Sequence, residues 1–174
     1  MERRSIIFLG IVTAALPFMF VVWSHTSFAD RWAAGSVDTF VPHGPTATFS
    51  DFSPTDRTAV LDDLGRPITG SPVYLLFQPR RHSKFIDVEI TIAEMMAPEN
   101  LPHIGYRQGT GPEHNVLVST DYSKYSGGLK LYARLPFAEM TAERVDARRI
   151  VLAAPTASMQ PPTHVSRVEI RYED

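Results

Sequence analysis

The chain has 174 residues with 17 basic and 19 acidic side chains and no cysteine. Its net charge of −2 argues against a nucleic-acid partner, because proteins that bind nucleic acids carry a basic excess or a basic stripe. Without cysteine, neither a disulfide framework nor a thiolate metal site can form. The length suffices for one domain with a hydrophobic core.

The N-terminal residues contain a long apolar run. The segment Ile6–Trp23 has no charged side chain and follows Arg3 and Arg4. As a helix of 18 residues it would span roughly 27 Å, close to the ~30 Å hydrocarbon core of a bilayer. Arginines on the N-terminal side favour a cytoplasmic N-terminus. The run therefore predicts a single-pass membrane protein whose C-terminal part lies outside the cytoplasm.

This anchor divides the chain into three parts. We expect a signal anchor over residues 1–24, a juxtamembrane linker over 25–45 and an extracytoplasmic domain over 46–174. A cleaved secretory signal is the alternative, because Ser27 and Ala29 provide the small residues that a cleavage site near Ala29 requires. In that case the domain would be secreted. The two arginines also faintly resemble the start of a twin-arginine signal.

From residue 46 onward the chain alternates between short apolar strands and turns. The segment Phe85–Ile92 places Ile86, Val88, Ile90 and Ile92 on one face and polar residues on the other, which is the pattern of a half-buried strand. The expected strands are Thr46–Phe49, Val73–Phe77, Phe85–Ile92, Ile104–Arg107, Val116–Ser119, Leu129–Leu135, Arg149–Ala153 and Val165–Tyr172. About eight short strands without a sustained helix predict an all-β, antiparallel β-sandwich.

Between these strands the composition favours turns and loops. Turns are expected near Asp51–Asp56 and Asp62–Pro67, where aspartate, proline and glycine are frequent. The segment Asp121–Gly128 predicts an exposed loop with a Gly127–Gly128 pair. Two further loops are expected at Met140–Asp146 and at Thr156–Thr163, which carries two consecutive prolines.

The strand layout resembles a jelly-roll β-sandwich of the galactose-binding or carbohydrate-binding-module kind. The resemblance is carried by Pro72–Phe77, Phe85–Ile92, the alternation through Leu135 and the closing strand Val165–Tyr172, and it covers about residues 46–174. It is a likeness of pattern without a diagnostic motif. It implies a glycan as one kind of ligand, and many unrelated sandwiches share the same pattern.

Sugar-binding sandwiches usually offer an aromatic ring on which the apolar face of a sugar packs. Both tryptophans precede residue 46, so tyrosines are the remaining candidates. The alternation of the strand Leu129–Leu135 directs Tyr132 outward together with Lys130 and Arg134. Tyr122 and Tyr125 could contribute from the neighbouring loop. These five residues form the candidate ligand site, and an ordinary solvated sheet face is the alternative.

Motifs for metal binding and catalysis are weak. Asp51, Asp56, Asp62 and Asp63 could supply oxygen ligands for a structural calcium ion, but aspartate is also a preferred turn residue. The six histidines are scattered without the spacing of a zinc site. No phosphate-binding loop or nucleophile elbow occurs, so no cofactor is expected.

The sequence thus favours a non-enzymatic, membrane-tethered extracytoplasmic module that binds an envelope protein or a glycan. A carbohydrate-active enzyme is the alternative from another class, since a glycosidase needs only two suitably placed carboxylates.

Overall fold

The computed structural model describes residues 37–173 except 81, 111–113, 145 and 156–157, and it leaves the side chains of 158–160 undescribed. The expected membrane anchor and cleavage site therefore lie outside the described residues. Within the described part, no helix is long and apolar enough to cross a membrane. The strands are β1 (Val37–Phe40), β2 (Arg66–Gly70), β3 (Val73–Phe77), β4 (Phe85–Ile92), β5 (His103–Arg107), β6 (Asn115–Leu117), β7 (Asp121–Tyr125), β8 (Gly128–Pro136), β9 (Arg148–Ala153) and β10 (Ser158–Glu173).

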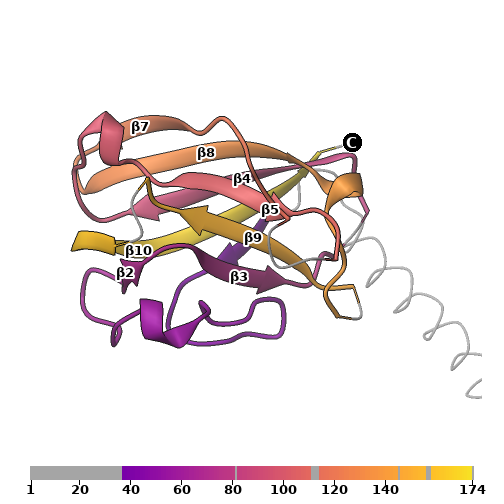
Figure 1. Cartoon of the computed structure of the whole chain (residues 1–174), viewed down its shortest axis with the longest axis horizontal. Coiled ribbons are helices and arrows are strands. Elements are labelled where there is room, and N and C mark those ends of the chain that lie inside the picture. Colours follow the sequence, from indigo (N-terminus) through magenta and orange to yellow (C-terminus); the bar gives the residue numbers. More distant parts are fainter. Residues whose placement is uncertain (1–36, 81, 111–113, 145, 156–157, 174) are drawn as a thin grey trace, which may run out of the picture. The chain divides into compact units, whose positions relative to one another are not determined.

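These strands form two antiparallel sheets, the arrangement of a β-sandwich (Figure 1). The six-stranded sheet has the order β1-β10-β4-β8-β7, and β2 also pairs with β10. The four-stranded sheet has the order β3-β9-β5-β6. Three short 3-10 helices lie in the described connections, at Thr55–Arg57, Pro98–Asn100 and Phe137–Glu139. The all-β, antiparallel prediction is confirmed at this level.

The alternating strands β4 and β8 lie in the middle of the six-stranded sheet and supply side chains to the hydrophobic core. In β4 the four residues at even positions from Ile86 to Ile92 are buried, whereas Asp87 and Glu89 face outward and are half-buried. In β8 the buried residues are Leu129, Leu131, Ala133 and Leu135. The four-stranded sheet contributes Val73, Leu75, Phe77, Ile104, Ile150 and Leu152. Side chains from the facing sides of both sheets therefore form one hydrophobic core.

Two segments that the sequence predicts as loops are strands. The first is β7, which lies inside the expected loop Asp121–Gly128 and pairs residue by residue with β8. The second is the start of β10, which lies inside the expected loop Thr156–Thr163 and pairs with β2. The register of β10 shifts between Ser158 and Thr163, the stretch that holds both prolines. Because proline has no amide hydrogen to donate, such an irregularity lets the strand contain them.

Strands also begin where the sequence does not predict them. β1 lies within the range expected to be linker, pairs with β10 and buries Phe40 in the core. β2 follows the turn at Asp62. In contrast, the expected strand Thr46–Phe49 provides only an isolated bridge between Phe49 and Phe77. Short strands of this kind depend on their partners rather than on their own periodicity.

Two glycines combine a positive φ with a backbone contact too close for a Cβ atom. Gly128 begins β8 with a φ of +142°, and a Cβ atom there would lie 2.1 Å from the carbonyl oxygen of Ile92. Gly65 has a φ of +132°, and its Cβ would lie 2.4 Å from the carbonyl oxygen of Val165. Both glycines thus allow close backbone approaches at one end of the six-stranded sheet.

A buried polar cluster fastens β1 to the rest of the sheet. The Tyr172 hydroxyl donates a hydrogen bond of 2.6 Å to Asp38 Oδ2, and both residues are almost completely buried. The other Asp38 oxygen contacts the Arg80 guanidinium, and the Arg80 amide donates to the Tyr172 hydroxyl at 3.3 Å. Burial, together with the neighbouring Asp38 carboxylate, raises the pKa of Tyr172 far above its usual range.

Candidate functional site

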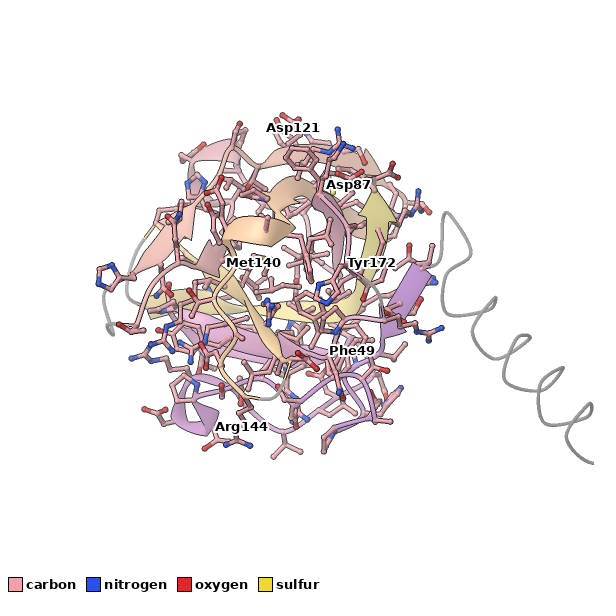
Figure 2. All side chains as sticks on the ribbon, turned by 90° about the vertical axis from the view of Figure 1, so that its right-hand side faces the viewer. Phe49, Asp87, Asp121, Met140, Arg144 and Tyr172 are labelled. Atoms are coloured by element: carbon pink, nitrogen blue, oxygen red, sulfur yellow. The ribbon has the colours of Figure 1, made fainter. Side chains whose placement is uncertain are left out.

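A hollow of about 690 Å³ opens on the outer face of the six-stranded sheet, toward its β7 edge. Charged side chains from four strands surround it. Figure 2 shows two of them, Asp87 and Asp121, on the same upper side of the molecule. The lining residues are Asp87, Val88, Glu89, Val118, Ser119, Asp121, Tyr132, Ala133, Arg134, Arg171 and Glu173.

Strand register explains why these side chains meet. Tyr132 of β8 pairs with Asp121 on one side and with Glu89 on the other. One step further along the sheet, Asp87 lies between Arg134 and Arg171. Directly opposed residues in antiparallel strands project from the same face. The tyrosine ring is therefore flanked by carboxylates on both neighbouring strands.

Two ion pairs hold Asp87 and Glu89, two of the charged residues that line the hollow. Arg134 binds Asp87 through Nε at 2.9 Å and through a terminal nitrogen at 3.4 Å, and its guanidinium lies 5.4 Å from the centre of the Phe85 ring. Lys130 Nζ donates to Glu89 Oε1 at 2.6 Å. The hydrogen bond and the charge of Glu89 raise the pKa of Lys130, so the ammonium form is favoured.

The remaining groups of the hollow are available to a ligand. Tyr132 is 36% exposed, and its hydroxyl lies 3.2 Å from Ser123 Oγ. Asp121 and Glu173 form no side-chain ion pair with any described residue. The hollow thus combines one accessible ring, two arginines and unpaired carboxylates, a set that can donate and accept hydrogen bonds around a polar ligand.

Of the five residues that the sequence predicts as the ligand site, some line the hollow and others lie elsewhere. Tyr132 and Arg134 line the hollow, and Lys130 lies beside it on the same face. Tyr125 also projects from this face, but its hydroxyl is directed to the carbonyl oxygen of Ile92 at 3.5 Å. Tyr122 pairs with Leu131 and therefore projects from the opposite side of β7.

Sequence reasoning misses several residues that line the hollow. Asp87 and Glu89 are recognisable as outward-facing from the alternation of β4, and Arg171 from that of β10. Their meeting with Tyr132 depends on which strands are neighbours, and no local pattern reveals that. Asp121 is not recognisable because the sequence predicts a loop there.

The aspartates considered for calcium do not gather into a site. Within the described residues, no group of three or more histidine, aspartate or glutamate side chains could hold a metal ion. Asp51 forms an ion pair of 2.8 Å with Arg66. Asp62 accepts hydrogen bonds from the Leu64 amide at 2.9 Å and from His164 at 3.0 Å. Although partial burial opposes it, these bonds and the charge of His164 lower the pKa of Asp62.

Comparison with known proteins returns no relatives: no protein family, no curated protein and no solved structure matches the chain.

Proposed function

We propose that this protein is a non-enzymatic binding module of the cell envelope, held to the membrane by its N-terminal segment, and that the hollow on the six-stranded sheet is its ligand site. The observation that supports the proposal is the exposed Tyr132 ring set among fixed charged groups. We also propose that the domain is a jelly-roll sandwich like those of carbohydrate-binding modules. The pattern of strands in the sequence supports this likeness. An envelope protein or a glycan is the ligand.

The chemistry of the hollow favours the glycan among these ligands. A tyrosine ring offers an apolar face to the C–H groups of a sugar, and paired hydroxyls suit carboxylate and guanidinium groups. Arg134 and Asp87 hold each other in place, so their orientation does not have to be fixed when a ligand binds. Such preorganisation lowers the entropic cost of binding.

Tyr132→Ala is expected to weaken binding by at least about tenfold, or ~1.4 kcal/mol, because it removes the ring from the hollow. The full-length protein in detergent would first be applied to a glycan array, and the dissociation constant for each retained glycan would then be measured. Tyr122→Ala is the matched control, since Tyr122 is similarly exposed but projects from the other side of β7. Equal losses for the two variants would contradict the assignment of the hollow.

The location is tested separately. We expect the full chain to sediment with membranes and its C-terminal domain to be degraded by protease added to the outside of spheroplasts. Protection of the domain from that protease would contradict an extracytoplasmic location. Recovery of a soluble protein that begins near Asp30 would instead show cleavage and secretion.

A carbohydrate-active enzyme is the second candidate, because the hollow gathers four carboxylates. Asp87 and Glu89 are neutralised by Arg134 and Lys130, which leaves Asp121 and Glu173 as candidate acid and base. Glycoside hydrolysis requires two such groups. If a bound glycan is cleaved by the wild type and survives with Asp121→Asn, the enzymatic function replaces the binding function.

A further inference from the structure

β7 forms one edge of the six-stranded sheet. Within the part of the chain that the structure describes, its five residues pair only with β8, and all five are exposed. In Figure 1 the strand lies at the upper margin of the domain, with β8 below it. An edge strand of this kind presents unpaired backbone groups and is a template for another strand.

The pairing with β8 determines which backbone groups are free. Tyr125 pairs with Gly128 across a two-residue turn, so this pair exchanges backbone hydrogen bonds. Hydrogen-bonded pairs alternate with non-bonded pairs in an antiparallel ladder, so Ser123 and Asp121 also bond to β8. The amides and carbonyls of Tyr122 and Lys124 therefore point away from β8. Among the described residues, no backbone hydrogen bond occupies them.

We propose that β7 binds β7 of a second copy of this chain, antiparallel, about a two-fold axis at Ser123. In this register Tyr122 and Lys124 of one copy exchange four backbone hydrogen bonds with Lys124 and Tyr122 of the other. The two side chains of each such pair share a face, so each lysine lies beside a tyrosine ring. Asp121 faces the partner's Tyr125, and no like charges are opposed.

Two neighbouring registers also place the free backbone groups of the two strands opposite each other, but their side chains are less compatible. A shift in one direction places Lys124 opposite the partner's Lys124, which is repulsive. A shift in the other direction leaves Tyr125 outside the pairing. The register centred on Ser123 is the one that uses all five residues of β7 and opposes no like charges.

The distribution of exposed aromatic side chains supports a protein partner at this edge. The described residues include four exposed aromatic side chains, and three of them are Tyr122, Tyr125 and Tyr132 of β7 and β8. Tyrosine is enriched where proteins associate. The two-fold axis would run perpendicular to the sheet, so the hollows of both copies would open on the same face of one continuous sheet. The dimer does not depend on what those hollows bind.

A cysteine at the axis tests the proposal directly. The chain has no cysteine, so Ser123→Cys carries a single thiol, which in the dimer lies opposite its own copy in a non-bonded pair. We expect mild oxidation of the full-length protein in detergent to yield a disulfide-linked dimer at least tenfold faster than for Thr39→Cys. Thr39 is a matched control because it is exposed on β1, at the other edge of the same sheet. Similar rates for both variants would overturn the proposal.

A proline supplies the second measurement. Lys124→Pro removes an amide hydrogen that faces away from β8, so the fold is retained while two hydrogen bonds of the dimer are lost. We expect this variant to keep the circular dichroism spectrum and melting temperature of the wild type and to sediment as a monomer at concentrations where the wild type is dimeric. A wild type that is monomeric at about 100 µM, or a folded Lys124→Pro that remains dimeric, would refute the β7 interface.

Discussion

Gly128→Ala is expected to lower the free energy of unfolding by about 4 kcal/mol or more, the largest effect of any single methyl group considered in this domain. The added Cβ would lie 2.1 Å from the Ile92 carbonyl oxygen, and the φ of +142° is strained for any residue with a side chain. The obstacle is backbone, which cannot rotate away as a flexible side chain can. Thermal unfolding followed by circular dichroism should show a melting temperature at least ~10 °C lower.

The variant Gly44→Ala distinguishes the two causes of the stability loss expected for Gly128→Ala, which are the positive φ and the contact with the Ile92 backbone. Gly44 has a φ of +126°, close to that of Gly128, but a Cβ there would meet no atom within 4 Å. This variant therefore measures conformational strain alone, which is expected to cost about 1 kcal/mol. Equal destabilisation by both substitutions would show that the close approach to Ile92 has no energetic consequence.

Tyr172→Phe is expected to destabilise the domain by about 2 kcal/mol, because it leaves a buried Asp38 oxygen without its donor. Chemical denaturation at neutral pH measures the effect. Tyr122→Phe removes the same hydroxyl from an exposed side chain and is expected to change the stability by less than ~0.5 kcal/mol. A similarly small change for Tyr172→Phe would mean that the cluster does not stabilise β1.

The hydrogen bond between Tyr172 and Asp38 also predicts that the stability of the domain depends on pH. Because the pKa of Tyr172 is raised by folding, the unfolded chain loses the hydroxyl proton near pH 10 while the folded chain retains it. The stability contributed by the neutral hydroxyl is therefore complete below about pH 10 and declines above it, by ~1.4 kcal/mol per pH unit for one group. The stability difference between wild type and Tyr172→Phe should accordingly shrink between pH 9 and pH 11. A constant difference would contradict the raised pKa.

The sequence predicts the strands whose own side chains alternate between core and solvent and those, such as β3 and β9, that form a continuous apolar run. β4 and β8 have the alternating pattern over their full lengths, and both are found where expected. β7 has no buried residue, so its five polar and aromatic residues carry no periodic signal. β1 is short and buries Asp38, a charged residue that a hydrophobic pattern assigns to the surface. Its place in the sheet depends on Tyr172 and Arg80, which come much later in the chain.

The candidate site is also predictable only in part, because local patterns show where a side chain points but not which strands are neighbours. The outward direction of Tyr132 and Arg134 follows from the alternation of β8. The carboxylates beside them come from β4 and β7, and the neighbour relations of strands are long-range properties that no single segment encodes. Tyr122 and Tyr125, which are close in sequence to each other, project from different sides of β7 because side chains alternate along a strand.

The pairing of β1 with β10 has a mechanical consequence. Val37 lies opposite Arg171, so the chain enters β1 and leaves β10 at the same end of the sheet. If the segment before Val37 tethers the domain to a membrane, a pull on a bound ligand would be transmitted through four residue pairs of a short edge strand. Under such tension β1 would peel away before the central strands separate. Asp38 of β1 contacts Tyr172 and Arg80, and these contacts would determine the force at which β1 detaches from the sheet.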